Sequence, residues 1–204
     1  MEDVQIPDEQ PTDAATPTQN PLTEDPRPAQ LRRADSLLLV NTGDGKGKSS
    51  AAFGVLMRSV ARGWKVAVVQ FIKSGDWNVG EEKVARQLGV DWWSLGAGFS
   101  WDSDDLTEDQ AIANEAWRQA ETVLRSGEYQ LVILDEITYP INWGWISLDL
   151  VVDTLRSRSP KTNVIVTGRD APAPIVDLAD TVTEMRNVKH AYDSGIRAKK
   201  GIDY

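Results

Sequence analysis

The chain has 204 residues, 31 of them acidic and 22 basic, with one histidine and no cysteine. This length suits one domain, the lack of cysteine excludes disulfides and thiolate chemistry, and a single histidine excludes a multi-histidine metal centre. Without a basic excess, an apolar run of roughly 20 residues or a signal-peptide pattern, the sequence predicts a soluble, cytoplasmic protein that binds neither nucleic acid nor membranes.

Residues 1–30 differ in composition from the rest of the chain. They hold seven acids, one base and six of the ten prolines, with almost no large apolar side chains. Such a segment cannot bury enough apolar surface to offset the entropy lost on ordering. We expect a disordered, acidic, proline-rich tail over residues 1–30 and a folded domain over residues 31–204. A solvated tail without catalytic role is favoured, and a lid that orders on ligand binding is the alternative.

From residue 36 onward, short apolar runs alternate with stretches of helical spacing. Thr107 and Gln110 form a capping box that predicts the start of the third helix. Near-continuous apolar strands separated by helices predict a mostly parallel sheet covered by helices on both faces, and hence the α/β fold class. The predicted strands span residues 36–41, 65–72, 90–94, 130–135 and 163–167, and the predicted helices span residues 48–62, 81–88, 107–125 and 147–156.

The first strand leads into a glycine-rich loop, TGDGKGKSS (42–50), which a helix follows. Glycines let backbone N–H groups converge, and the helix start adds positive potential, so phosphate oxygens are well matched here. Lys48 is placed to reach the β- and γ-phosphates, and the Ser49 hydroxyl to ligate Mg²⁺. The usual G-x-x-x-x-G-K-S spacing would put a glycine where Thr42 stands, and Lys46 is an additional base. The loop predicts a nucleoside triphosphate site in a single P-loop NTPase-like (RecA-like) domain.

The predicted strand 130–135 ends in Asp135-Glu136. In a parallel-sheet fold, such a strand end places a carboxylate beside the phosphate loop, where it binds Mg²⁺ or orients water. Either of the two acids can take this role on the residues alone.

Aromatic residues are dense after two of the predicted strands, at Trp92, Trp93, Phe99 and Trp101 and again at Tyr139, Trp143 and Trp145. Glycine-rich aromatic loops at strand ends are typical of a binding wall for a large, flat, apolar ligand. Trp92 and Trp93, on a predicted strand, are better interpreted as core residues. Phe99 and Trp101 lie in a flexible, polar stretch, which favours a functional role.

The chain resembles the P-loop corrinoid adenosyltransferases, which make adenosylcobalamin from ATP and a reduced corrinoid. The resemblance extends from about residue 36 to the last residue, and the altered phosphate loop is part of it. The acidic tail has no counterpart in it. The stretches that carry it are TGDGKGKSSAAFG (42–54), VAVVQFIK (66–73), GAGFSWD (96–102), VILDEITY (132–139), VIVTGRD (164–170) and DLADTVTEMRNVKHAYDSGIRAKKGIDY (177–204).

The resemblance implies that Co(I) of the corrinoid attacks C5′ of ATP and expels the triphosphate. It favours Glu136 over Asp135 near Mg²⁺, together with Ser49, and it implies that Phe99 and Trp101 pack under the corrin ring and exclude the lower axial ligand. It also implies a homodimer, and a flavoprotein reductant is a possible partner. The residues expected to contact ATP or corrinoid are Gly43, Asp44, Gly45, Lys46, Gly47, Lys48, Ser49, Ser50, Arg169 and His190.

Two of these residues have simpler interpretations, because Arg169 can form a surface salt bridge and His190 can be a hydrogen-bonded structural residue. The alternative function is a P-loop kinase or ATPase of RecA-like fold. A nucleotide-sensing regulator, which binds both ligands without forming a cobalt–carbon bond, is a third possibility.

Overall fold

The computed structural model describes residues 23–25, 30–72, 80–96 and 106–203. The chain divides into two units, residues 1–33 and 34–204, and the helices and strands lie in the second. Of the predicted tail, residues 1–22 and 26–29 lie outside the described residues, so its disorder stays a prediction.

A six-stranded, all-parallel sheet forms the centre of residues 34–204, in the order β3-β2-β4-β5-β1-β6. The apolar runs form the strands because side chains on both faces of such a sheet are buried. The expected α/β fold with a parallel sheet is confirmed. The strands are β1 (Leu38–Thr42), β2 (Val66–Gln70), β3 (Asp91–Ser94), β4 (Leu131–Asp135), β5 (Asn163–Thr167) and β6 (Thr181–Glu184).

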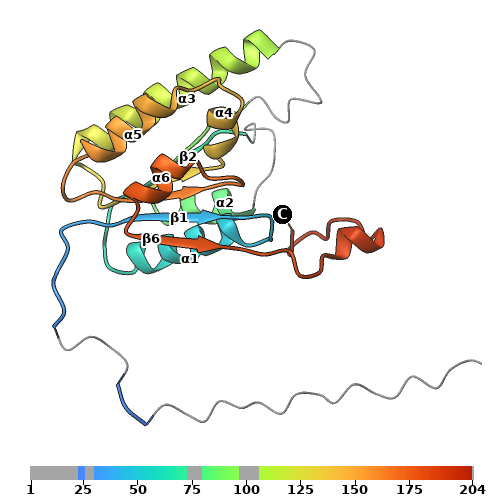
Figure 1. Ribbon diagram of the computed structural model, residues 1–204, viewed down its shortest axis with the longest axis horizontal. Helices are drawn as coiled ribbons and strands as arrows, with labels where there is room; N and C mark the ends of the chain where they lie inside the picture. Colours follow the sequence, from blue (N-terminus) through green and yellow to red (C-terminus); the bar gives the residue numbers. More distant parts are fainter. Residues whose placement is uncertain (1–22, 26–29, 73–79, 97–105, 204) are drawn as a thin grey trace, which may run out of the picture. The chain divides into compact units, whose positions relative to one another are not determined.

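Helices cover both faces of this sheet (Figure 1). Alternate residues of each central strand point to opposite faces, so Val66 and Val68 pack with α1 and α2, whereas Ala67 and Val69 pack with α3 and α5. The prediction that Trp92 is a core residue is confirmed, because it is buried beneath α1 and α2, and Trp93 is partly buried on the other face. The helices are α1 (Lys48–Val60), α2 (Gly80–Gln87), α3 (Leu106–Ser126), α4 (Thr138–Asn142), α5 (Leu148–Arg156), α6 (Ala173–Leu178) and the 3-10 helix η2 (Ala191–Ser194).

The capping-box prediction for the third helix is wrong. Helix α3 begins at Leu106, so Thr107 is its second residue and cannot be its N-cap. The sequence offers other cap-type residues just before Leu106 (Ser103, Asp104 and Asp105), and these lie outside the described residues. By contrast, Ser147 is the N-cap of α5, where its hydroxyl accepts a hydrogen bond from the Leu150 N–H.

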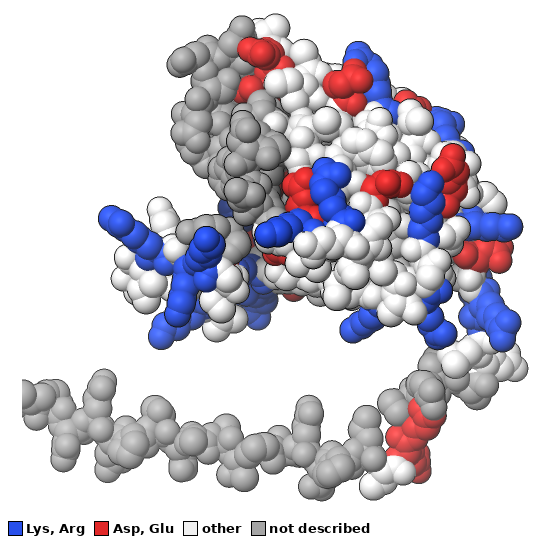
Figure 2. Space-filling model, turned by 180° about the vertical axis from the view of Figure 1, so that it is seen from behind, with Lys and Arg blue, Asp and Glu red and all other residues white. Residues whose placement is uncertain are grey.

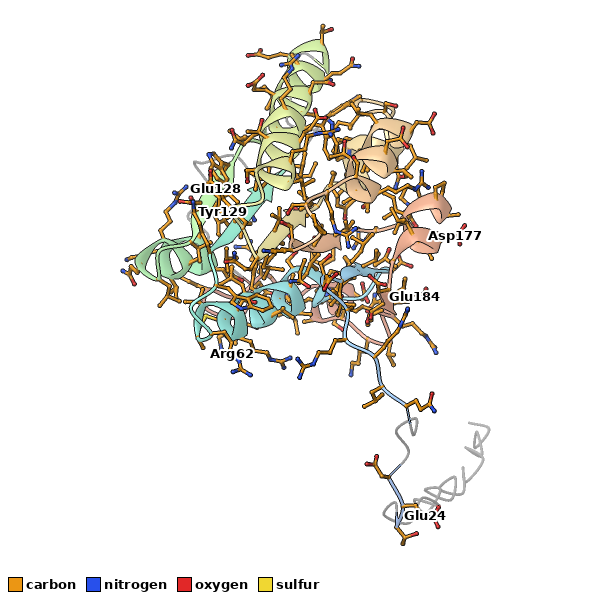
Figure 3. All side chains as sticks on the ribbon, turned by 90° about the vertical axis from the view of Figure 1, so that its left-hand side faces the viewer. Glu24, Arg62, Glu128, Tyr129, Asp177 and Glu184 are labelled. Atoms are coloured by element: carbon orange, nitrogen blue, oxygen red, sulfur yellow. The ribbon has the colours of Figure 1, made fainter. Side chains whose placement is uncertain are left out.

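The amino edge of the sheet carries an exposed charged cluster (Figure 3 labels Glu128 and Tyr129). The Lys65 ammonium lies 2.8 Å from the Glu128 carboxylate and 4.5 Å from the centre of the Tyr129 ring. The Tyr129 hydroxyl donates to Asp91 at 2.8 Å. These groups are paired with one another at the edge opposite the phosphate loop.

No helix in the part of the chain that the structure describes is long and apolar enough to cross a membrane.

Candidate active site

The phosphate loop joins β1 to α1 at the carboxyl edge of the sheet. Gly47 has a φ of 115° and leads directly into α1, which begins at Lys48. This left-handed conformation favours glycine, because a side chain is strained there. The Asn41 side-chain amide donates to the Lys48 carbonyl at 3.1 Å and holds the base of the loop against the end of β1.

The chain segment after β6 lies directly on this loop. The Met185 N–H donates to the Thr42 carbonyl at 2.8 Å, and the Gly45 N–H donates to the Met185 carbonyl at 2.6 Å. A Cβ on Gly43 would lie 2.5 Å from the Met185 carbonyl oxygen, and one on Gly45 would lie 2.7 Å from that of Arg186. Gly43 and Gly45 are therefore required by the close approach of a second backbone. The sequence alone predicts only phosphate contacts and a folded-back loop for these two glycines.

A pocket of about 490 Å³ opens beside the loop. Its lining comes from the phosphate loop and α1, from α2, from the residues after β4 and β5, and from the segment after β6. The lining residues are Asp44, Gly45, Lys46, Gly47, Lys48, Ser49, Ser50, Phe53, Glu81, Glu136, Tyr139, Arg169, Asn187, His190, Tyr192, Asp193 and Asp203.

This pocket brings together most of the site residues predicted from the sequence. Gly43 is not part of the lining, because it lies under Met185. Phe99 and Trp101 lie outside the described residues.

Lys48 is the half-buried cation of the pocket. Its ammonium donates to the Gly45 carbonyl at 2.7 Å. Burial lowers the pKa of Lys48 below its ordinary value, and the Arg169 guanidinium lowers it further, whereas Asp44 and Glu136 act in the opposite direction. An anionic ligand would offset both the burial of the Lys48 ammonium and its repulsion by Arg169, so Lys48 and Arg169 together favour phosphate in this pocket.

Lys46, the additional base of the loop, forms an ion pair with Asp203 near the end of the chain. Asp203 also accepts the Lys199 N–H at 2.7 Å. This backbone hydrogen bond lowers the pKa of Asp203 most, and the bond from Lys46 lowers it further. The segment after β6 thus contacts the loop twice, at Met185 and at Asp203.

Exposed bases gather on the same segment, which extends from the end of β6 and carries η2 (Figures 1 and 2). Exposed bases beside a pocket raise its positive potential and favour the approach of anions. These bases are Arg186, Lys189, Arg197, Lys199 and Lys200.

Asp135 and Glu136 have different surroundings. Asp135 is fully buried, and its two carboxylate oxygens accept hydrogen bonds from Gln70 at 2.9 Å and from Thr167 at 2.7 Å. Glu136, with a left-handed φ of 64°, lines the pocket with Lys48. Of these two acids, Glu136 is therefore the one whose side chain lines the pocket.

Arg169 and Tyr139 line the pocket from the residues after β5 and β4. Gly168 has a φ of 141°, and a Cβ there would lie 2.0 Å from the Thr138 hydroxyl, so glycine permits the close turn that carries Arg169 into the pocket. Burial raises the pKa of Tyr139, while Arg169 acts in the opposite direction. The Tyr139 ring packs at 5.8 Å from that of Trp143, which lies 4.6 Å from Trp145. The predicted aromatic wall after β4 thus adjoins the pocket.

His190 lines the pocket and also has a structural role. Its Nδ1 accepts the Tyr192 N–H at 3.1 Å and caps η2. The structural role of His190 is therefore confirmed, and its contact with a ligand stays a prediction.

The contributions of Phe53, Glu81, Asn187, Tyr192, Asp193 and Asp203 to the lining are not predicted from the sequence. The last four come from the segment after β6, and no local spacing in the sequence indicates that this segment returns to the phosphate loop.

The oxygens of Ser49 and Glu136 suit Mg²⁺. Mg²⁺ is held in nucleotide sites by one or two protein oxygens, and substrate phosphates and water complete its coordination. Among residues 23–25, 30–72, 80–96 and 106–203, no three His, Cys, Asp or Glu side chains form a cluster that would hold a metal by itself. A hydroxyl and one carboxylate beside a phosphate loop match a metal that arrives with its nucleotide.

A parallel α/β sheet whose first strand leads through a glycine-rich loop into Lys48-Ser49 defines a P-loop nucleotide-binding protein. The family model described as ATP:corrinoid adenosyltransferase BtuR/CobO/CobP matches residues 34–204. The chain belongs to this family and is a corrinoid adenosyltransferase by homology.

Curated relatives agree with this assignment. The chain is 43% identical over 180 residues to the corrinoid adenosyltransferase of Escherichia coli, across 88% of this chain and 91% of that protein. It is 41% identical to corrinoid adenosyltransferase CobA of Salmonella typhimurium, with the same two coverages. It is 42% identical over 182 residues to the corrinoid adenosyltransferase of Pseudomonas aeruginosa, across 88% of this chain and 89% of that protein.

Proposed function

We propose that this enzyme transfers the 5′-deoxyadenosyl group of ATP to Co(I) of a reduced corrinoid and releases the triphosphate, in adenosylcobalamin biosynthesis or salvage. The observation that carries the proposal is the pocket that combines the cations Lys48 and Arg169 with the oxygens of Ser49 and Glu136. A leaving triphosphate needs this combination, because negative charge develops on it as the bond to carbon breaks.

The reaction is a substitution at carbon. The electron pair of Co(I) forms a bond to C5′, the bond between C5′ and the triphosphate oxygen breaks, and the triphosphate leaves with that electron pair. Bound Mg²⁺ would supply further charge neutralisation on the phosphates. The chain's own part would be electrostatic and positional: Lys48 and Arg169 would stabilise the departing charge, and Ser49 and Glu136 would hold the metal that orients the triphosphate.

A metal-centred nucleophile needs no general base. Adenosyl transfer therefore needs no proton acceptor among the pocket residues, and the one histidine of the pocket, His190, uses Nδ1 to cap η2. A hydrolase or kinase would instead need a group that orients or deprotonates an attacking oxygen.

We assign the metal contact to Glu136 and Ser49, and the ATP contacts to the loop from Asp44 to Ser50 with Arg169. The burial of Asp135 behind Gln70 and Thr167 supports the choice of Glu136. Gly43 and Gly45 take part indirectly, by admitting the Met185 segment against the loop.

We further propose that Phe99 and Trp101 pack under the corrin ring. They follow β3, whose carboxyl end lies at the same edge of the sheet as the phosphate loop. A homodimer, a flavoprotein reductant and a cytoplasmic location remain part of the proposal. The lack of cysteine is in keeping with a reducing compartment.

Anaerobic incubation with ATP, Mg²⁺ and a chemically reduced corrinoid tests the function directly. We expect an absorbance change to the alkylated corrinoid, and the product spectrum should be lost on illumination, because light breaks the cobalt–carbon bond homolytically to Co(II). Omitting ATP is the control. Binding of both ligands without this light-sensitive product would indicate a nucleotide-sensing regulator instead.

A further inference from the structure

A continuous chain of buried hydrogen bonds crosses four strands at the carboxyl edge of the sheet. The Trp92 indole N–H of β3 donates to the Gln70 side-chain oxygen of β2 at 3.2 Å, and the Gln70 amide donates to Asp135 of β4 at 2.9 Å. From the other side, the Thr167 hydroxyl of β5 donates to Asp135 at 2.7 Å and accepts the Glu136 N–H at 2.9 Å. Gln70, Asp135 and Thr167 have no exposed surface.

The direction of every bond in this chain is fixed by its two ends. A carboxylate only accepts, so the Gln70 amide must face Asp135 and the Gln70 oxygen faces the Trp92 N–H, which also donates to the Ser94 hydroxyl at 3.0 Å. A backbone N–H only donates, so the Thr167 oxygen accepts from Glu136 and its single proton is left for Asp135. The bonds from Gln70 and from Thr167 therefore both end on the Asp135 carboxylate. Because this carboxylate accepts both bonds, the donors and acceptors of the network have a single arrangement.

The network ends on the backbone of Glu136. A glutamate with a φ of 64° occupies a region that is unfavourable for residues other than glycine, asparagine and aspartate, and it persists only where its surroundings hold it. The bond from the Glu136 N–H to Thr167 is such a restraint. Because Thr167 is itself fixed by Asp135, the direction of the Glu136 side chain depends on both residues.

We infer that Asp135 and Thr167 are positioning residues that hold Glu136 toward the metal–phosphate site and do not themselves contact the metal or the nucleotide. The inference rests on the proposed function, because it takes Glu136 as the metal contact. Asp135, the more deeply buried acid of the Asp135-Glu136 pair, then acts through Glu136. Thr167 has the same kind of role, although nothing in the phosphate-loop motif indicates it.

The test measures metal binding with Mn²⁺ as the probe, from the electron paramagnetic resonance signal of free Mn²⁺ in the presence of ATP and the full chain. Thr167→Val keeps the shape of the side chain and removes the hydroxyl. We expect it to weaken Mn²⁺ binding by about tenfold, as loss of a group that orients a metal ligand typically does. Thr167→Ser keeps the hydroxyl and should restore wild-type affinity. ATP affinity without metal should be the same in all three proteins.

Thr162→Val is the matched control, because Thr162 is equally buried and also uses its hydroxyl as a donor, to the Tyr129 carbonyl at 2.8 Å at the opposite edge of the sheet. It should leave Mn²⁺ affinity unchanged. If Thr167→Val does not fold, Thr167→Ala replaces it, with the same expected direction.

Glu136→Gln separates the two ways of failing. If Glu136→Gln weakens Mn²⁺ binding and Thr167→Val does not, the positioning role is wrong and the metal assignment stands. If Glu136→Gln leaves Mn²⁺ affinity unchanged, both the metal assignment and the positioning role are wrong. Equal weakening in Thr167→Ser and Thr167→Val would also overturn the inference, because the hydroxyl would then not be responsible.

Discussion

The two edges of the parallel sheet carry polar residues that are arranged in opposite ways. At the amino edge, Lys65, Asp91 and Glu128 lie in or near solvent and pair with one another. At the carboxyl edge, Gln70, Asp135 and Thr167, the last residues of β2, β4 and β5, are fully buried in a network that ends beside a pocket.

This difference separates stabilising from functional polar groups. Exposed ion pairs contribute little to stability and require nothing of their neighbours. Buried polar groups cost free energy unless every bond is made, so a buried network is retained where it also fixes a side chain that a ligand needs. We therefore expect substitutions at the carboxyl edge to change activity and equivalent ones at the amino edge to change only stability.

Lys48→Ala should have the largest effect. Removing one electrostatic contact to the leaving triphosphate is expected to lower the rate about 10²–10³-fold. The measurement is the rate of adenosylation at saturating ATP. Lys65→Ala, at the amino edge, is the matched control and should keep wild-type turnover. Near wild-type turnover of Lys48→Ala would show that the phosphates lie elsewhere.

The loss of rate in Phe99→Ala and Trp101→Ala should depend on the oxidation state of the cobalt in the starting corrinoid. An aromatic wall disfavours a polar axial ligand, because a desolvated polar group costs about 1–3 kcal/mol. Loss of the wall should therefore slow the reaction from Co(II) about 5- to 150-fold more than the reaction from pre-reduced Co(I).

The ratio of these two rates, with the spectrum of bound Co(II) in the presence of ATP, is the measurement. ATP affinity should change little. Equal slowing from both states would mean that the aromatic pair only shapes the pocket, and no slowing would mean that these are core residues.

Five of the six strands that the structure describes, β1 to β5, are predicted to within two residues at either end. The runs VAVVQ, LVILD and NVIVT form β2, β4 and β5 to within two residues at either end, because burial of successive side chains demands apolar residues. Strand β6 was missed, because all four of its residues, TVTE, are exposed and carry no apolar run. The short helices α4 and α6 each contain a proline and too few residues to show a helical period.

The residues of the candidate site also divide into those that the sequence predicts and those that it does not. Local motifs predicted Lys48, Ser49 and the acids after β4, because the chemistry lies in adjacent residues. The contacts of Met185 and Asp203 with the loop join parts of the chain about 140 and 157 residues apart, and no spacing rule predicts such contacts. The strand pattern does indicate Thr167, since this polar residue ends the apolar strand β5, as Asp135 ends β4.

Tyr129→Phe at the amino edge should have a smaller effect, on stability alone. It removes the hydroxyl that donates to Asp91, which is worth about 1 kcal/mol of unfolding free energy. Burial, and then the bond to Asp91, raises the pKa of Tyr129 above its ordinary value of 10.0. The unfolded chain therefore loses this proton first as the pH rises through 10, and the contribution of the hydroxyl declines there.

Denaturant unfolding of both proteins from neutral to alkaline pH measures this effect. The difference in stability should narrow above pH 10, and adenosylation at neutral pH should be unchanged. A fall in turnover at neutral pH would contradict the separation between the two edges.

Deletion of residues 1–30 should have the smallest effect. The segment has too few apolar side chains to contribute to a core, so the thermal midpoint of the truncated protein should stay close to that of the full chain. A large fall would mean that the segment packs on the domain. Unchanged stability with lost activity would favour the lid interpretation.

The central claim is that Co(I) displaces the whole triphosphate from ATP at the pocket on the carboxyl edge of the sheet. Phosphorus NMR of an anaerobic reaction with reduced corrinoid, compared with the amount of cobalt–carbon bond in the same sample, tests it most directly. The account predicts one inorganic triphosphate for each adenosylated corrinoid, and no product without corrinoid. ADP and inorganic phosphate as the products would contradict it and identify a hydrolase or kinase.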